Sequence, residues 1–300
     1  HGFGFLVRNS KSVEFRNLGI MRAMDDGISL DTDNSNIWIH HIDVFYGKAG
    51  GGDHAKGDGA IDVKSNSKFV TIDHCHFWDT GKSSMCGMKS ESGPNYITYH
   101  HNWFDHSDSR HARVRTMSVH LWNNFYDGCA KYGIGATTGS SVFSENNYFR
   151  ATKDPILISL QGTDAKGSGT FSGESGGMVK EYGSIFAEKG SGSNYSPITY
   201  AADNKSFDFY QATSRDEQVP SSVVSLSGGN TYNNFDTNPS LMYSYTPDAT
   251  AAVPSRVTGF YGAGRLNHGS LQFKFDNAVE DTNDAPIPAL ETLIDAYAGE

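Results

Sequence analysis

The acidic residues whose types and spacing suit metal binding lie in two short segments, Asp25-Asp26 and Asp58-Gly-Ala-Ile-Asp62. Residues at even spacing along a β-strand point to one face, which places Asp58 and Asp62 together. If neighbouring segments stack on one another, Asp26 comes to the same face. Carboxylates gathered in this way repel one another unless a cation joins them, and hard oxygen ligands select Ca²⁺. The alternative is that these residues are solvated aspartates in turns.

The basic residues that could bind an anion are Lys82 and the run Arg110-His-Ala-Arg113-Val-Arg115. We expect the three arginines to lie on one strand and to present their side chains to one face. In a chain with a formal net charge of −10, such a stripe would be a local anion-binding site. The alternative is a ladder of salt bridges that balances the aspartates.

A repeated stretch of alternating apolar residues, followed by polar amide or imidazole residues, supplies strands that would position these groups. The repeats read Val13-Glu-Phe-Arg-Asn17, Ile37-Trp-Ile-His-His41, Val70-Thr-Ile-Asp-His74, Ile97-Thr-Tyr-His-His101, Val119-His-Leu-Trp-Asn123 and Val142-Phe-Ser-Glu-Asn146. Their uneven spacing is typical of a solenoid in which each coil keeps its core strand and varies its loops. The repeats are β-branched and aromatic, with no helical period, which favours a parallel β-helix over a leucine-rich repeat.

Small or polar residues recur at a fixed offset, five residues past the start of each repeat. The later repeats have Asn102, Asn124 and Asn147 at this offset, and the earlier repeats have Cys75, Ile42 and Leu18. Stacked asparagines in a turn can hydrogen-bond along the axis, which satisfies buried amides coil by coil. We therefore expect an asparagine ladder, with Cys75 as a buried filler in the same row. The three cysteines form neither a disulfide framework nor a zinc motif.

The acidic and basic groups fall on four consecutive coils of this expected solenoid, near positions 26, 60, 82 and 110. Equivalent strands of neighbouring coils lie about 4.8 Å apart. A groove across these coils would therefore hold the metal, the lysine and the arginines together.

After about residue 160 the repeat pattern loosens. We expect Gly/Ser-rich loops at Gly162–Gly177 and Gly190–Ser196, strand-like runs at Ile198–Ala201 and Val223–Leu226, and a short amphipathic helix over Pro288–Ala298 that packs outside the coil. No linker indicates a second domain, so we expect one domain over residues 1–300.

Other motifs and function classes are less well supported. An acidic surface argues against nucleic-acid binding, and the sequence has no apolar run of 18 residues to span a membrane. Gly173-Glu-Ser175-Gly-Gly177 fits the pattern of a nucleophilic serine, but no strand precedes it and no helix pattern follows it. The pairs His40-His41 and His100-His101 could suggest zinc. Because adjacent residues of a strand point to opposite faces, we expect these histidines to line the core or a groove.

The segment from Asp26 to Asn147 resembles the pectate lyase family of the pectate lyase superfamily. The motifs that carry the resemblance are Asn36-Ile-Trp-Ile-His-His, Asp58-Gly-Ala-Ile-Asp-Val-Lys, Val70-Thr-Ile-Asp-His, Ile97-Thr-Tyr-His-His-Asn, Val119-His-Leu-Trp-Asn-Asn and Arg110-His-Ala-Arg-Val-Arg115. The resemblance implies a right-handed parallel β-helix that cleaves α-1,4-polygalacturonate by calcium-dependent β-elimination, with 4,5-unsaturated oligogalacturonates as products. It also implies secretion to the cell surface, periplasm or medium, since the substrate is a plant cell-wall polymer, and we expect a monomer.

The resemblance also implies roles for individual residues. Aspartates at the positions of Asp26, Asp58 and Asp62 bind Ca²⁺. The residue at Arg110 is the base that removes the C5 proton, those at Lys82 and Arg115 assist it, and Lys82, Arg113 and Arg115 bind substrate. A free guanidinium has a pKa of about 12.5 or above, and neighbouring cations would lower it. An alkaline activity optimum is therefore expected.

The chain departs from the family pattern in two motifs. The proline of the arginine motif is Ala112 here, and His40 replaces an acid in Trp38-Ile-His-His. Neither change touches the inferred metal ligands or base. The family also has further coils before the position of His1, which we expect to be either absent or trimmed here.

Three rival functions remain. A polygalacturonase would hydrolyse the polymer with paired carboxylates, for which Asp25 and Asp26 are the candidates. A pectin lyase would act on methyl-esterified polymer without calcium, which leaves the three aspartates without a role. A β-helical carbohydrate-binding or adhesin module would bind without turnover.

Overall fold

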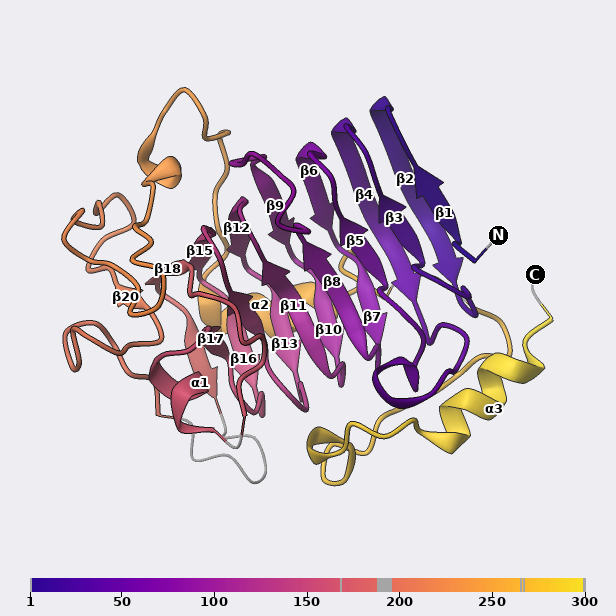
Figure 1. The fold of residues 1–300 in the computed structure, drawn as a ribbon. Helices are drawn as coiled ribbons and strands as arrows, with labels where there is room; N and C mark the ends of the chain where they lie inside the picture. The colour runs from indigo at the N-terminus through magenta and orange to yellow at the C-terminus, as the bar shows by residue number, and fades with distance from the viewer. Residues whose placement is uncertain (1, 168, 188–195, 265, 267, 299–300) are drawn as a thin grey trace.

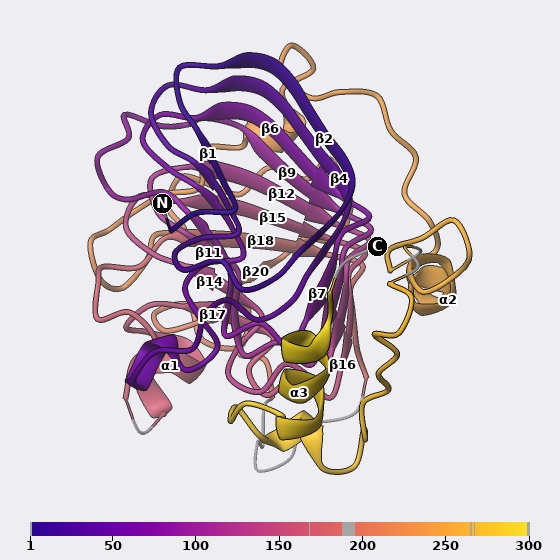
Figure 2. The same ribbon diagram turned by 90° about the vertical axis from the view of Figure 1, so that its right-hand side faces the viewer.

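The computed structural model describes residues 2–167, 169–187, 196–264, 266 and 268–298. The chain winds into stacked coils whose strands form long parallel sheets (Figure 1). A view turned by 90° shows that the coils surround a common interior (Figure 2). The prediction of a parallel β-helix is therefore confirmed.

One sheet, which we call the first face, contains seven strands within the described residues. In order along the axis these are β1 (Phe5–Val7), β3 (Ile28–Leu30), β5 (Ile61–Val63), β8 (Lys82–Cys86), β11 (Ser109–Val114), β14 (Ile134–Ala136) and β17 (Ile156–Ile158). All neighbours pair in parallel, because each coil returns to this face in the same direction.

A second sheet contains thirteen strands among the described residues and forms two faces of the coil. The second face consists of β2 (Lys11–Ile20), β4 (Ser35–Val44), β6 (Lys68–Asp73), β9 (Ile97–His100), β12 (Ser118–Trp122), β15 (Ser141–Glu145), β18 (Met178–Tyr182) and β20 (Tyr210–Gln211). The third face consists of β7 (His76–Trp78), β10 (Trp103–Asp105), β13 (Phe125–Asp127), β16 (Tyr148–Arg150) and β19 (Ile185–Ala187). The long strand β4 pairs with both β6 and β7, which joins the two faces.

The six repeats found in the sequence are adjacent strands of the second face. Their first residues pair in one continuous row, Val13, Ile37, Val70, Ile97, Val119 and Val142. Inside the third face, aromatic rings stack in the same way, with centroids 4.3 to 5.1 Å apart, through Phe77, Phe104, Tyr126, Phe149 and Phe186. Such rows bury apolar area in every coil, so the stack itself is the hydrophobic core.

The predicted asparagine ladder is present in the turn after the second face. The Asn102 Nδ2 donates to Asn124 Oδ1 at 3.0 Å, and the Asn124 Nδ2 donates to Asn147 Oδ1 at 3.1 Å. All three side chains are fully buried. Cys75 lies at the same offset and is also buried, and its backbone N–H donates to Asn102 Oδ1. The role expected for Cys75 as an inert filler is confirmed.

The structure after residue 160 differs from the expectation in several places. A short helix, α1 (Gly162–Lys166), lies in a segment expected to be loop, and β18 adds a seventh strand in register with the repeats. The predicted strands at Ile198–Ala201 and Val223–Leu226 are wrong, since these runs make only the isolated bridges Thr199–Phe209 and Val224–Thr231. Most of the loop predicted at 190–196 lies outside the described residues.

The C-terminal segment covers the outside of the coils. It carries α2 (Val253–Val257) and α3 (Pro288–Ala296), and α3 lies beside the N-terminal coils (Figure 1). Leu290 and Ile294 of α3 pack in a small core with Phe45 and Tyr46. The predicted external helix is therefore confirmed. Among the described helices, none has the length and apolar character needed to cross a bilayer.

Candidate functional site

The acidic and basic groups singled out in the sequence lie on neighbouring strands of the first face. The strand order β3, β5, β8, β11 brings the four coils together as expected. Lys82, at the start of β8, pairs with Ser109 on one side and forms a bridge with Gly59 on the other. The groups therefore form one row along the axis, from the carboxylates through Lys82 to the arginines.

The carboxylates of the turns before β3 and β5 form the acidic end of this row. Asp25, Asp26 and Asp58 each present an oxygen, and these oxygens all lie within 4.8 Å of one another. Asp26 is buried, and its Oδ1 accepts the Gly59 N–H at 3.1 Å, which fixes the carboxylate against the next coil. Asp25, which lies in the acidic segment singled out in the sequence but was not among the three predicted ligands, belongs to this cluster.

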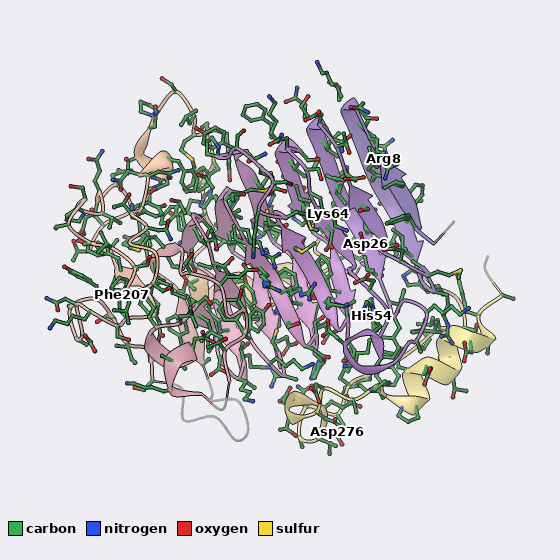
Figure 3. All side chains as sticks on the ribbon, viewed as in Figure 1. Arg8, Asp26, His54, Lys64, Phe207 and Asp276 are labelled. Atoms are coloured by element: carbon green, nitrogen blue, oxygen red, sulfur yellow. The ribbon has the colours of Figure 1, made fainter. Side chains whose placement is uncertain are left out.

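Asp62 lies on β5 beside the cluster and shares a lysine with it. Lys64 contacts Asp26 Oδ2 and lies 3.4 Å from Asp62 Oδ2, and Figure 3 shows Lys64 beside Asp26 on the outside of the first face. Burial first, and the Asp26 charge second, raise the pKa of Asp62 to about 7. Lys64 was not among the residues predicted for the site, although its spacing of two residues from Asp62 places both side chains on one face.

Lys82 occupies the middle of the row. Its ammonium lies 2.9 Å from Asp58 Oδ1, 3.4 Å from Asp53 Oδ2 and 3.3 Å from His54 Nδ1. Asp53 and His54 come from the 3₁₀ turn η1 (Gly52–His54), which lies over this part of the first face. Lys82 thus connects the carboxylate cluster to the neighbouring loop.

The arginines reach one side of β11 because the strand is irregular. A regular strand would send Arg110 and Arg113, three residues apart, to opposite faces. The register shifts between His111 and Arg113, and Arg110 adopts a positive φ of 65°. Both arginines consequently line one cleft. The expectation of a shared face is confirmed for Arg110 and Arg113, whereas the expectation that all three arginines lie on one strand is wrong, because β11 ends at Val114, one residue before Arg115.

A glutamate that the sequence did not single out lies among the cations. Glu174 accepts two hydrogen bonds from Arg115, at 2.9 and 3.1 Å, and lies 3.5 Å from Arg113 and 2.9 Å from Lys89. Burial alone would raise the pKa of Glu174, but the hydrogen bonds from Arg115 and Lys89 outweigh it and lower the pKa to about 2. Glu174 is therefore the carboxylate partner of Arg113 and Arg115, whereas Arg110 lies 3.6 Å from Asp53. Glu174 belongs to the segment that resembled a nucleophile motif, and nothing in that motif indicates this contact.

A cleft of about 270 Å³ opens beside the arginines. Lys131, Lys153, Tyr132 and Phe171 also line it. Burial, together with the charges of Arg115 and Arg110, lowers the pKa of Arg113. The four cations of the lining outnumber its three aspartates, Asp53, Asp154 and Asp164, so the cleft has a slight excess of positive charge in a chain whose net charge is −10.

The residues at the acidic end fit a hard divalent cation. Their donors are carboxylate oxygens, which Ca²⁺ prefers and takes in groups of about six to eight with waters or ligand oxygens. Asp25, Asp26 and Asp58 are close enough to share one ion. Asp62 could join them if Lys64 moved aside, because the Lys64 ammonium lies between it and Asp26. The basic end could hold an anion, so the row as a whole suits an acidic polymer bound through both metal and guanidinium.

The histidine pairs do not follow the alternation expected of a strand. The second histidine of each pair has a positive φ, 51° for His41 within β4 and 53° for His101 just after β9. The two rings of a pair therefore turn toward each other. The Nδ1 atoms of His40 and His41 lie 2.9 Å apart, and those of His100 and His101 lie 3.0 Å apart.

Comparisons with known proteins find relatives in one family. A family model described as pectate lyase matches residues 2–266. Curated relatives include a pectate trisaccharide-lyase of Bacillus licheniformis, 30% identical over 160 residues that cover 52% of this chain and 46% of the relative. Pectate lyase A of Emericella nidulans is 31% identical over 170 residues, or 54% and 50% of the two chains. The chain thus spans about half the length of these curated relatives.

Solved structures of similar proteins have the same fold. Pectate lyase II of Xanthomonas campestris superposes with a TM-score of 0.61 at 25% identity, over 87% of this chain and 72% of the other. Pectate lyase C of Erwinia chrysanthemi, solved with Ca²⁺, superposes with a TM-score of 0.59 at 22% identity, over 87% and 67%. The family match extends from the first described strand past the last coil of the β-helix. This chain therefore belongs to the pectate lyase family.

Proposed function

We propose that the protein is a calcium-dependent pectate lyase that cleaves α-1,4-polygalacturonate by β-elimination and releases 4,5-unsaturated oligogalacturonates. The observation that carries the proposal is the row on the first face, where a carboxylate cluster, a lysine and three arginines follow one another on adjacent coils. A relative's structure supports the substrate class, since a pectate lyase C variant was solved in complex with pentagalacturonic acid.

The acidic end would hold the metal through Asp26, Asp58 and Asp62, with Asp25 as a further oxygen donor. When bound, Ca²⁺ would supply Lewis-acid neutralisation of a substrate carboxylate. The C5 proton of a galacturonate is only weakly acidic, and its removal places negative charge on that carboxylate. Lys82, which lies next to the cluster, would add positive charge where this negative charge develops.

The basic end would bind uronates and remove the proton. Arg113 and Arg115 would pair with substrate carboxylates, for which the planar guanidinium is suited. Arg110, which lines the cleft and pairs with Asp53 only at 3.6 Å, would accept the C5 proton in its neutral form. The electron pair of the C5–H bond would then form the C4–C5 double bond as the glycosidic oxygen leaves C4. Because a neutral guanidine is needed, activity should rise toward alkaline pH.

We further propose that the protein acts as a secreted monomer, since its polymeric substrate is a cell-wall component. The cleft would attract an acidic polymer through Lys131 and Lys153, which together with Arg110 and Arg113 outnumber the three aspartates of its lining by one.

The deciding experiment follows the ultraviolet absorbance of the unsaturated product from polygalacturonate, with added Ca²⁺ and with a chelator. A rise that needs Ca²⁺ and that the chelator abolishes is the expected result. New reducing ends without the absorbance would instead indicate hydrolysis by Asp25 and Asp26. Binding without either signal would leave a carbohydrate-binding module. Activity on methyl-esterified pectin that is unaffected by the chelator would indicate a pectin lyase.

A further inference from the structure

Another group of side chains that could hold a metal ion lies on the second face, on different strands from the row described above. Asp73 ends β6, His74 follows it, and His100 ends β9. Asp73 and His100 pair directly in the register of these two neighbouring strands. The three residues therefore come from two consecutive coils and meet because the coils stack.

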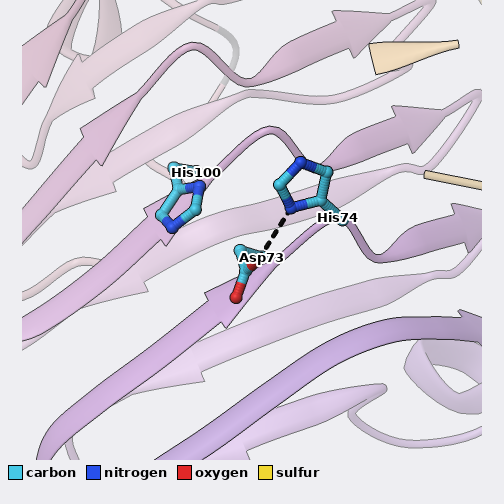
Figure 4. A group of neighbouring side chains, drawn as sticks. All are labelled: Asp73, His74 and His100. Atoms are coloured by element: carbon cyan, nitrogen blue, oxygen red, sulfur yellow. Dashed lines mark hydrogen bonds and ion pairs between the residues drawn. The ribbon is translucent and has the colours of Figure 1, made fainter. Parts of the chain in front are cut away.

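The ligand atoms of this group converge. One atom from each of Asp73, His74 and His100 lies within 4.8 Å of the other two. The His74 Nδ1 lies 2.7 Å from Asp73 Oδ2. Figure 4 shows the rings of His74 and His100 on either side of the Asp73 carboxylate. Donors around a tetrahedral Zn²⁺ lie about 3.3 Å apart, given Zn–N bonds of about 2.0 to 2.1 Å, so only small side-chain rotations separate this arrangement from a metal site.

Neighbouring residues hold the donors in place. The Trp38 indole N–H donates to Asp73 Oδ1, which leaves Oδ2 directed at His74. Partners of this kind orient the ligands of protein metal sites.

A chain of contacts also selects the tautomer of His100. The His101 Nε2 lies 3.2 Å from an Asp248 oxygen, and the His101 Nδ1 lies 3.0 Å from the His100 Nδ1. A carboxylate accepts hydrogen bonds, so His101 carries its hydrogen on Nε2 and donates it to Asp248, and the His101 Nδ1 accepts a hydrogen bond from the His100 Nδ1. The His100 Nε2 is then left with a lone pair, which is the form that a metal requires.

The donor set suits a particular class of cation. Two imidazoles and a carboxylate form a donor set for borderline first-row cations, whereas Ca²⁺ prefers oxygen alone.

We propose that Asp73, His74 and His100 bind a first-row divalent cation of the Zn²⁺ class, which joins two consecutive coils of the β-helix. The ion would replace the direct contact between His74 Nδ1 and Asp73 Oδ2, and the ring proton of His74 would then reside on Nε2. The His74 side chain is 26% exposed, so water can reach the ion and complete its coordination. The site is independent of the proposed lyase reaction, since its residues belong to another face.

The test uses protein without a histidine tag, saturated with Ca²⁺ so that the carboxylate cluster on the first face does not compete. Titration calorimetry with Zn²⁺ is expected to show one additional site per chain. Co²⁺ in place of Zn²⁺ is expected to give the visible absorption of a cation with nitrogen ligands.

The variants His74→Asn and His100→Asn are expected to weaken Zn²⁺ binding at least 30-fold each. His40→Asn is the matched control, because His40 pairs with Asp73 one coil earlier but does not belong to the group. It is expected to bind Zn²⁺ as the unmodified chain does. Equal losses in all three variants, or unchanged binding in His74→Asn and His100→Asn, would overturn the proposal. So would the absence of a site tighter than about 100 µM in the unmodified chain, a result that needs no variant to fold.

Discussion

At the scale of single residues, the proposed active site is a set of opposite charges that already neutralise one another. Lys64 contacts Asp26 and Asp62, and Lys82 pairs with Asp58. A cation can enter the carboxylate cluster only by displacing these ammonium groups. Binding of metal is therefore an exchange of partners, which predicts a modest affinity for Ca²⁺ in the absence of substrate.

Lys64 gives the sharpest test of this exchange. Replacing it with an uncharged side chain of similar length, Lys64→Met, should tighten Ca²⁺ binding about tenfold, which is roughly 1.4 kcal/mol. The reason is that the ion then meets no competing cation between Asp26 and Asp62. Calorimetric titration with Ca²⁺ measures the effect, with Lys68→Met on the exposed start of β6 as the control. Weaker binding in Lys64→Met would show that Lys64 supports the ion rather than competing with it.

Arg110 is the residue on which the proposed proton transfer depends. Arg110→Ala should lower kcat by about 10² to 10⁴, the usual contribution of a general base. Ca²⁺ affinity should change little, because Arg110 makes no contact with Asp26, Asp58 or Asp62 among the ion pairs of the described residues. Product absorbance and Ca²⁺ calorimetry on the same preparation separate the two effects. A variant that keeps its kcat but loses affinity for the polymer would reassign Arg110 to substrate binding.

At the scale of elements, a loop between β17 and β18 reaches the arginine stripe. Glu174 lies 59 residues after Arg115 in the sequence. This contact places a carboxylate where a uronate of the polymer would otherwise pair with guanidinium. The loop thus occupies part of the proposed substrate site in the free protein.

Removing the charge of this loop should favour substrate. Glu174→Gln is expected to lower KM for polygalacturonate several-fold and to leave kcat nearly unchanged. The reason is that substrate carboxylates then no longer have to displace a charged glutamate from the arginines. Steady-state kinetics over a range of polymer concentrations provide the measurement. Glu291→Gln in the distant helix α3 controls for the change in net charge. A higher KM would mean that Glu174 orders the arginines for binding instead of occupying them.

The asparagine ladder makes a second prediction for the elements. The Asn124 Oδ1 accepts hydrogen bonds from the backbone and side-chain N–H groups of Asn102, and the Asn124 Nδ2 donates a hydrogen bond to the Tyr99 carbonyl oxygen at 3.0 Å. All of these groups are buried. Asn124→Ala leaves several buried groups without partners, and each costs about 1 to 3 kcal/mol. Chemical denaturation should therefore show a loss of about 3 kcal/mol or more.

Cys75→Ala supplies the matched control for the ladder, since Cys75 lies in the same row and its thiol makes only weak contacts. It should cost clearly less than Asn124→Ala. Equal losses in the two variants would mean that packing, rather than hydrogen bonding, dominates the row.

The extent to which the sequence predicted these elements has a physical basis. Strands of the second face and the order of coils on the first face follow from local alternation repeated in every coil, so both could be predicted. Lys64 could also have been predicted, because its spacing of two residues from Asp62 places both side chains on one face of the strand. Glu174 and the paired rings of His100 and His101 depend on a distant loop and on left-handed turn residues. Neither a long-range contact nor a turn conformation is encoded in the alternation of polar and apolar residues.

At the scale of the whole molecule, the C-terminal segment runs back along the outside of the coils and is held there by polar contacts. Asp248 accepts from His101 and donates its N–H to Asn123 Oδ1 at 2.7 Å. Farther along the segment, Asp281 pairs with Arg150 at 2.8 Å and with His106 at 3.0 Å. These contacts tie residues more than a hundred positions apart, so the segment is expected to contribute to the stability of the entire stack.

His106 makes this contribution depend on pH. Burial by itself would lower the pKa of His106, but hydrogen bonds to Asp105 and Asp281 and the nearby charge of Asp127 raise it to about 10, against an ordinary value near 6.5. A group whose pKa is raised by folding stabilises the native state fully at pH values below its pKa in the unfolded chain, and this stabilisation is lost as the pH rises toward its pKa in the folded chain.

Thermal unfolding should therefore show a Tm that falls between pH 7 and pH 9.5. His106→Gln should have a lower Tm at pH 7 and a flatter profile, because its side chain cannot titrate. A slope as steep in His106→Gln as in the unmodified chain would assign the pH dependence to other groups. If the slope does belong to His106, the alkaline conditions that favour a neutral Arg110 also weaken the attachment of the C-terminal segment, and the pH optimum of prolonged activity should lie below that of the initial rate.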